Sequence, residues 1–193
     1  MYLAQRIVPR YEALSQAGRN VVSEVIRVDQ AGEVAANWIY RGQMAVLGKD
    51  QVLGPIIQEM WDQEKKHLRV MDKLQIEYQA RPTLLMEVAK ITGFGLGAVT
   101  ALMGKEAAMA CTEAVETAIG EHYEHQLQQL ETISPNNEGI SQLKDLIKEL
   151  RDDELEHLGT AVAENSQRAP AHALMSAVIE LGCNVAIQLC KRI

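Results

Sequence analysis

Two short stretches of the chain, WDQEKKHL at 61–68 and RDDELEHL at 151–158, share Asp, Glu, His and Leu at matching places. Each contains the pattern Glu-x-x-His, and the four residues are Glu64, His67, Glu154 and His157. On a helix of 3.6 residues per turn, residues three apart lie on one face, so each stretch directs a carboxylate and an imidazole the same way. Both groups are common metal ligands.

A further Glu precedes each stretch within an Ala-rich amphipathic run: Glu33 in AGEVAAN and Glu116 in AVETAIG. The full pattern is therefore Glu…Glu-x-x-His, twice. Four carboxylates and two imidazoles are the set that a four-helix bundle uses to hold two metal ions in its core. A ligand field of oxygen with some nitrogen suits Fe or Mn, and two reduced irons could activate O₂ to attack an inert C–H bond.

The spacing of these residues predicts two helical hairpins. Glu33 and Glu64 are 31 residues apart, and Glu116 and Glu154 are 38 apart. Each interval accommodates the rest of one helix, a turn and half of an antiparallel neighbour. A single hairpin cannot satisfy three buried ligands, whereas two hairpins packed face to face bring six together.

A simpler interpretation is that these Glu and His residues lie on solvated helix faces, where Glu-x-x-His occurs by chance. The duplication favours a metal site over this alternative. A buried carboxylate must be paired or bound to a cation, because isolating its charge costs several kcal/mol.

The composition indicates an all-α protein. The chain has 193 residues, 47% of them apolar and only 4% aromatic, and it lacks β-branched alternation. We expect one domain over residues 1–193, with residues 1–20 as a loosely ordered N-terminal arm. A net charge of −7 argues against nucleic acid as a partner, since phosphate binding needs a basic surface.

The cysteines and the glycines exclude other kinds of site. Cys111, Cys183 and Cys190 are odd in number and lack Cys-x-x-Cys spacing, so we expect neither a disulfide framework nor a zinc or rubredoxin-type iron site, and a reducing compartment. No GxGxxG follows a predicted strand, so electrons must come from a bound reductant or a partner. We expect no targeting signal in the chain.

Six helices are expected. Four would form the bundle, at about 18–47, 52–79, 105–132 and 139–167, and a turn is expected at 134–137. Two more are accessory: one within 84–104 and one beginning at Pro170. The last helix carries an apolar stripe that we expect to face the core, formed by Leu174, Val178, Leu181, Val185 and Leu189.

Segment 84–104 is the most apolar part of the chain. Its uncharged run, 91–104, is 14 residues long and is too short to span a bilayer, which takes about 20 residues. It is either a buried crossover helix, or an interfacial helix that admits a lipophilic substrate. Gly93, Gly95 and Gly97 could let such a substrate pass close to the backbone.

Several longer stretches resemble one family, the 5-demethoxyubiquinone hydroxylases of coenzyme Q biosynthesis. The resemblance covers about residues 22–193. It lies in the two Glu-x-x-His stretches and in RVDQAGE (27–33), GQMAVLG (42–48), RPTLLM (81–86), KEAAMACTEAVE (105–116) and HY (122–123).

The resemblance implies a ferritin-like four-helix bundle with a di-iron centre. It would hydroxylate the ring of a polyprenyl-methyl-methoxy-benzoquinone with O₂ and NADH-derived electrons, the penultimate step of ubiquinone biosynthesis. The family's ligands fall on the six residues reached above from spacing: Glu33, Glu64, His67, Glu116, Glu154 and His157. It also implies that His122 and Tyr123 lie near the irons and act in proton or electron transfer.

The resemblance further implies a peripheral protein on the matrix side of the mitochondrial inner membrane, or on the plasma membrane in bacteria. It implies a lipid-binding partner protein, and a homo-oligomer is compatible with it. We therefore expect segment 84–104 to lie at the membrane interface and to admit the polyprenyl tail.

Two other functions use the same features. A ferritin-like protein that oxidises iron or consumes peroxide would have the same six ligands, although it needs no apolar segment. A structural member of the quinone-biosynthesis complex would not need its metal site at all.

Overall fold

The computed structural model describes residues 14–133 and 137–193, and every regular element within these ranges is a helix. The all-α prediction is confirmed. The helices are α1 (Gln16–Leu47), α2 (Leu53–Glu77), α3 (Met86–Leu102), α4 (Lys105–Ile133), α5 (Glu138–Ala163) and α6 (His172–Cys190), with a 3₁₀ turn, η2 (Ser166–Arg168), before α6.

The observed ends of the helices follow local capping. Ser15 caps α1 by accepting a hydrogen bond from Gly18 N, so residues 16–20 of the expected arm are helical, while residues 1–13 lie outside the described residues. Residues 134–136 of the expected turn also lie outside them, and Asn137 caps α5. Helix α5 ends earlier than predicted because Asn165 adopts a left-handed φ of 67°.

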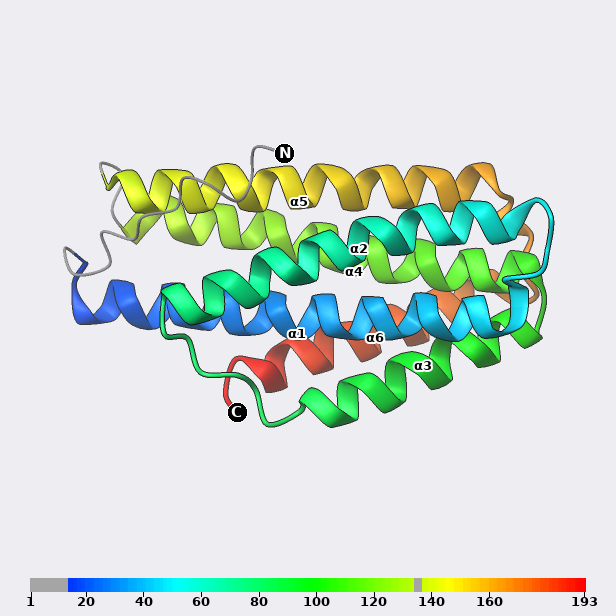
Figure 1. Ribbon diagram of the computed structural model, residues 1–193, viewed down its shortest axis with the longest axis horizontal. Coiled ribbons are helices and arrows are strands. Elements are labelled where there is room, and N and C mark those ends of the chain that lie inside the picture. Colours follow the sequence, from blue (N-terminus) through cyan, green and yellow to red (C-terminus); the bar gives the residue numbers. More distant parts are fainter. Residues whose placement is uncertain (1–13, 134–136) are drawn as a thin grey trace.

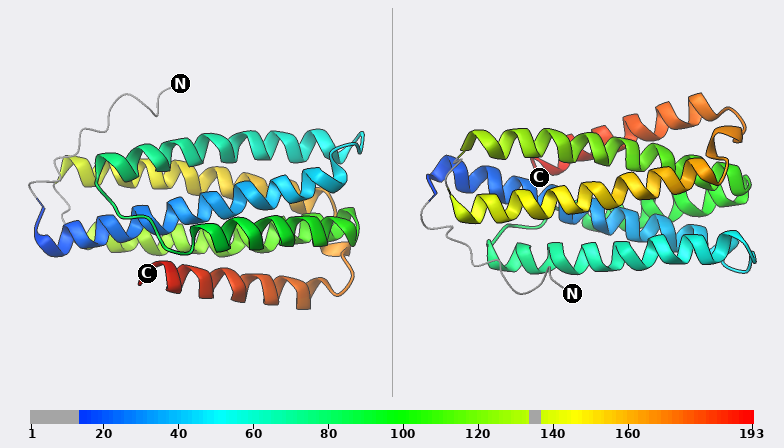
Figure 2. Two further views of the ribbon diagram at one scale, coloured as in Figure 1. Left: turned by 60° about the horizontal axis from the view of Figure 1, so that its bottom comes forward. Right: turned by 90° about the horizontal axis from the view of Figure 1, so that it is seen from above.

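The helices form three layers (Figure 1). Helices α1 and α4 lie in the middle, α2 and α5 cover one side, and α3 and α6 cover the other, as the further views also show (Figure 2). Helix α1 packs against α2, and α4 packs against α5, which gives the two expected hairpins. Helix α3 packs mainly on α1, and α6 mainly on α4.

Two apolar clusters flank the centre of the four-helix bundle. The first includes Ile26, Met71 and Ile147, and the second includes Ile57 and Met109. Each cluster draws residues from all four bundle helices. The helices are thus fixed above and below the level at which the Glu-x-x-His stretches lie.

Helix α3 meets α1 through glycines. A Cβ atom on Gly97 would lie 2.0 Å from the carbonyl oxygen of Ile39, and one on Gly93 would lie 2.7 Å from that of Ala35. Gly93 and Gly97 thus allow close packing of two helices, and the passage of a substrate along this backbone stays a prediction. Gly95 has open space around it.

This contact predicts opposite effects of alanine at two glycines in the same helix. Gly97→Ala should destabilise the protein by about 1–3 kcal/mol, because the methyl group meets backbone that must move. Gly95→Ala is the matched control and should stabilise it by up to about 1 kcal/mol through helix propensity. Urea unfolding followed by circular dichroism measures both, and equal effects would contradict the packing.

The apolar stripe of α6 faces outward, so its assignment to the core is wrong. Leu174 and Leu181 are 67% and 65% exposed, while Ile179, Ile187 and Cys190 are buried in their place. The helix is apolar on nearly all sides, and a stripe on such a helix does not show which side meets the bundle. By length and composition alone, α6 could cross a membrane.

Helix α3 is exposed in the same way. Ile91 and Leu102 are 73% and 74% exposed, and this helix lies on the same side of the bundle as α6 (Figure 1). We call the exposed apolar side chains of these two helices the apolar face. Its members are Val88, Ile91, Phe94, Val99 and Leu102 of α3 and Leu174, Val178, Leu181, Val185 and Leu189 of α6.

Candidate metal centre

The six residues singled out by their spacing meet in the middle of the bundle. All six are buried: Glu33 from α1, Glu64 and His67 from α2, Glu116 from α4, and Glu154 and His157 from α5. They form two groups, and within each group the candidate ligand atoms lie within 4.8 Å of one another. Glu64 and Glu154 belong to both groups, so the geometry provides two adjoining cation positions with two shared carboxylates.

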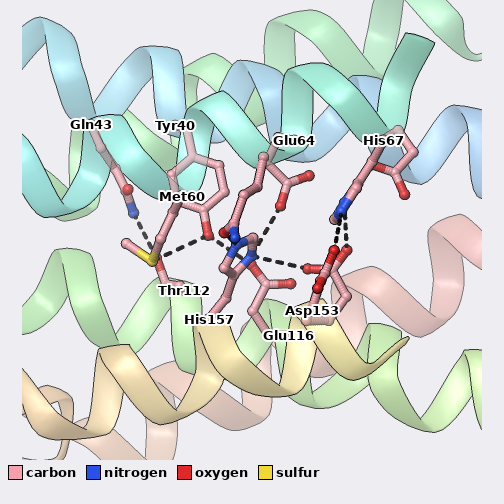
Figure 3. Close-up of polar contacts among 12 residues, drawn as sticks. Tyr40, Gln43, Met60, Glu64, His67, Thr112, Glu116, Asp153 and His157 are labelled. Atoms are coloured by element: carbon pink, nitrogen blue, oxygen red, sulfur yellow. Dashed lines mark hydrogen bonds and ion pairs between the residues drawn. The ribbon is translucent and has the colours of Figure 1, made fainter. Parts of the chain in front are cut away.

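Both imidazoles turn Nδ1 toward the carboxylates. His67 Nδ1 lies 3.4 Å from Glu154 Oε1, and His157 Nδ1 lies 3.1 Å from both Glu64 Oε1 and Glu154 Oε2. Figure 3 shows the imidazole of His157 beside the carboxylate of Glu64.

The outer nitrogen of each imidazole is held by the other hairpin. His67 Nε2 donates to Asp153 Oδ2 (3.0 Å), and His157 Nε2 donates to Gln63 Oε1 (2.6 Å). Gln63 and Asp153 are the residues directly before the two Glu-x-x-His patterns, so the two halves of the duplication brace each other. Such bonds fix the ring orientation and leave Nδ1 free to bind a metal.

Two tyrosines orient two of the carboxylates. The hydroxyl of Tyr40 donates to Glu116 Oε1 (3.0 Å), and that of Tyr123 donates to Glu33 Oε1 (2.8 Å). Both rings are buried. The oxygen of Glu33 that Tyr123 leaves free, Oε2, lies 3.8 Å from His67 Nδ1.

The donor set fits cations, as its unpartnered atoms show. Glu33 Oε2 and Glu64 Oε2 are buried and have no hydrogen-bond partner among the described residues. Burial raises the pKa of Glu33 to about 7, and burial with the charge of Glu154 also raises the pKa values of Glu64 and Glu116. Bound cations would satisfy these atoms and favour the charged carboxylates.

Protons take the place of cations when no metal is bound. Burial alone would raise the pKa of Glu154, but hydrogen bonds from His157 and His67 outweigh it and lower this pKa to about 2. Burial would lower the pKa of His67, but its hydrogen bond to Glu154 and the charge of Glu33 raise it to about 10. Metal binding would therefore release protons from this cluster.

The two neighbouring residues His122 and Tyr123 have different surroundings. Tyr123 contacts a candidate ligand, as described above. His122 Nε2 accepts a hydrogen bond from the amide of Gln126 (2.8 Å) and lies 3.6 Å from Asp29 Oδ1. Among the described residues, its polar contacts are with Gln126 and Asp29 and not with the six candidate ligands.

A cavity of about 530 Å³ connects the cluster with the apolar face. Its wall includes four of the candidate carboxylates, Glu33, Glu64, Glu116 and Glu154. The rest is largely apolar and comes from α1, α3, α4 and α6, including Val88, Leu96, Val178, Val185 and Leu189. A volume of this size suits a small organic molecule.

Comparison with known proteins agrees with this geometry. The family model described as "Ubiquinone biosynthesis protein COQ7" matches residues 20–190. The chain belongs to the COQ7 family. Its relatives in that family include a mouse protein named NADPH-dependent 3-demethoxyubiquinone 3-hydroxylase, mitochondrial, which is 50% identical over 93% of this chain and 81% of its own length.

Fungal and bacterial members of the COQ7 family are also similar. A Saccharomyces cerevisiae protein named 5-demethoxyubiquinone hydroxylase, mitochondrial, is 43% identical over 96% of this chain and 84% of its own length. A Rhodospirillum rubrum protein named 3-demethoxyubiquinol 3-hydroxylase is 41% identical over 90% of this chain and 79% of its own length. The resemblance to the demethoxyubiquinone hydroxylases is confirmed.

Sequence reasoning missed several polar residues of this COQ7-family site. Tyr40, Gln63 and Asp153 contact the candidate ligands, while Asp29 and Gln126 form a buried pair beside His122. The position of Gln63 and Asp153, directly before the repeated pattern, could have indicated two of them. Asp29 lies one turn before Glu33, on the same face of α1.

Proposed function

We propose that this chain hydroxylates the ring of demethoxyubiquinone or its quinol, using O₂ and two iron ions. The observation that carries the proposal is the cavity that joins the duplicated carboxylate and imidazole cluster to the apolar face. Relatives that match nearly all of this chain are named for this activity. An iron-storing or peroxide-consuming protein would need no apolar cavity of this kind.

The six candidate ligands would hold the irons, which suit a set of carboxylates and imidazoles. When bound, the irons supply activation of O₂ for attack on a ring carbon. Asp153 and Gln63 keep the two Nδ1 atoms directed inward, and Tyr40 and Tyr123 fix two carboxylates. The apolar wall excludes water from the reacting ring.

Electrons must arrive from outside the described helices, which contain no dinucleotide-binding strand and turn. We propose a reduced nicotinamide as their source. The family resemblance implies NADH, whereas the mouse relative is named for NADPH. His122 and Tyr123 lie in the cavity wall, which supports their proposed part in proton or electron transfer.

The apolar face supports the proposal that the protein binds peripherally to a membrane, with this face toward the lipid. Leaving large apolar side chains in water costs about 1.5–3 kcal/mol each. Helix α6 also buries one side against α4, which favours a position in the plane of the interface over a span. The ring could then enter the cavity while the polyprenyl tail stays in the lipid.

We propose the mitochondrial inner membrane, matrix side, as this membrane, because the mouse and yeast relatives are named mitochondrial. A bacterial source would imply the plasma membrane. A lipid-binding partner protein and self-association are further proposals that rest on the family resemblance. The net charge of −7 continues to argue against nucleic acid.

A single-turnover assay tests the activity. Protein loaded with Fe(II) is reduced, mixed with a demethoxyquinone and exposed to O₂, and the hydroxylated product is detected by mass spectrometry. Oxidation of iron with no oxygen atom in the quinone would contradict the proposal.

Glutamate on the apolar face should weaken membrane binding. The double variant Ile91→Glu/Leu181→Glu is expected to lower liposome binding at least about tenfold, because each change removes about 1.5–3 kcal/mol of apolar burial. It should also raise the apparent KM for long-tailed quinone and leave turnover of short-tailed analogues nearly normal. Flotation with liposomes and steady-state assays measure these effects.

Ile76→Glu is the matched control, since Ile76 is 78% exposed and belongs to α2, a helix on the side of the bundle opposite α3 and α6 (Figure 1). It should bind liposomes like the wild type. Equal losses in both proteins, or unfolding of the double variant in solution, would contradict the assignment of the apolar face.

A further inference from the structure

A small group of polar side chains is buried beside the candidate metal centre. Gln126 Nε2 donates to Asp29 Oδ1 (2.6 Å) and also lies 2.8 Å from His122 Nε2. The side chain of Asp29 is fully shielded from solvent. Its second oxygen, Oδ2, has no hydrogen-bond partner among the described residues.

This group lies in the wall of the large cavity. Asp29 and His122 both line it, next to apolar residues such as Val28, Ala31 and Ile187. Among the described residues of the wall, unpartnered buried side-chain oxygens belong to Asp29, Glu33 and Glu64. Two of these are candidate metal ligands, so Asp29 is the one whose free oxygen the metal centre does not account for.

The position of Asp29 relative to the cluster is set by α1. It precedes Glu33 by four residues, which places it on the same helix face and about 6 Å away along the axis. A group of the substrate that bound Asp29 would therefore hold the neighbouring ring atoms within reach of the carboxylate cluster.

We propose that Asp29 binds a ring oxygen of the quinone or quinol and so positions the ring for hydroxylation. This inference rests on the proposed function. A buried polar group in an otherwise apolar pocket fixes the orientation of a ligand, because leaving it unpaired is costly. Gln126 holds Oδ1, which leaves Oδ2 for the substrate.

The chemistry of a carboxyl group suits both redox states of the ring. A protonated carboxyl donates to a quinone oxygen, and an ionised one accepts from a quinol hydroxyl. Burial raises the pKa of Asp29, although the nearby His122 opposes this effect. The protonated form needed by the quinone is thereby favoured.

Equilibrium binding to the metal-free protein tests the inference without any turnover. The two probes are a demethoxybenzoquinone with a decyl tail and decylbenzene, which has the same tail and no ring oxygens. The variants are Asp29→Leu and Asp29→Ala, which remove the polar group, and Asp29→Asn, which keeps a donor of the same shape. Circular dichroism checks that each variant is folded.

We expect Asp29→Leu and Asp29→Ala to bind the quinone about fivefold to a hundredfold more weakly than the wild type, the range for losing a buried hydrogen bond. Asp29→Asn should bind it nearly as well as the wild type, and decylbenzene should bind all four proteins alike. A general packing defect would weaken both probes, and that result would overturn the inference.

Equal quinone binding by all four proteins would also overturn the inference while leaving the proposed function intact. Binding of decylbenzene but not of the quinone to the wild type would overturn the proposed function itself, and the inference with it. The two failures are thus distinguishable.

Discussion

Replacing Glu116 by alanine should reduce quinone hydroxylation at least about a hundredfold, because even the outer contacts of metal ligands are worth about 10–100-fold. Glu116 is one of the buried carboxylates of the second candidate group, with Glu64, Glu154 and His157. Helix content should stay nearly unchanged, since the two apolar clusters hold the four helices together. Iron analysis, the single-turnover assay and circular dichroism measure the three quantities.

Glu121→Ala is a suitable control for this experiment, because Glu121 is an exposed acid on the same helix. It should keep its iron and its activity. If Glu116→Ala hydroxylates the quinone at the wild-type rate, the assignment of six ligands is wrong.

The metal-free protein should lose several kcal/mol of stability as the pH rises from about 4.5 to about 10. Glu33 contributes stability that is present below its unfolded pKa and lost as the pH rises through about 7. His67 contributes stability that is lost as the pH rises through about 10. In both cases the folded state holds more protons than the unfolded chain.

Glu154 acts in the opposite direction, since its contribution is present above the unfolded pKa and lost as the pH falls through about 2. The metal-free protein should therefore be most stable in mildly acid solution. Urea unfolding at a series of pH values tests this profile.

Fe(II) added without oxygen should reverse the trend, because cations replace protons at the carboxylates and bind more tightly as the pH rises. Identical pH profiles with and without the metal would count against a clustered site.

The duplicated pattern was enough to predict which residues meet at the centre. Glu33 and Glu116 could be included because the interval from each to the next Glu-x-x-His stretch fits the rest of one helix, a turn and half of an antiparallel neighbour. The four bundle helices follow from the same reasoning, with ends near Gly, Pro and Asn residues. Here the periodicity of the sequence and the chemistry of buried carboxylates agree.

The accessory helices were harder to predict. Leu174 and Leu181 belong to a regular stripe, yet they are exposed, because α6 is apolar all round and only three-dimensional packing selects its inner side. The glycines around Gly97 are typical of a weak helix. The close packing of Gly97 depends on the backbone of Ile39 in the opposing helix α1. Neither fact is local in the sequence.

The polar contacts of the centre were missed for a related reason. Asp153 and Gln63 resemble solvated helix residues, and Asp29 has no repeated counterpart. Their roles depend on which residue of another helix lies opposite.

The cross-bracing of the histidines has a consequence for assembly. Because His67 is held by Asp153 and His157 by Gln63, neither hairpin can complete its ligand geometry until the two halves of the chain have docked. A folding intermediate with one hairpin formed would bind metal weakly, and the ions would load last. Metal binding would then stabilise the docked state of the two hairpins by mass action, without stabilising either hairpin alone.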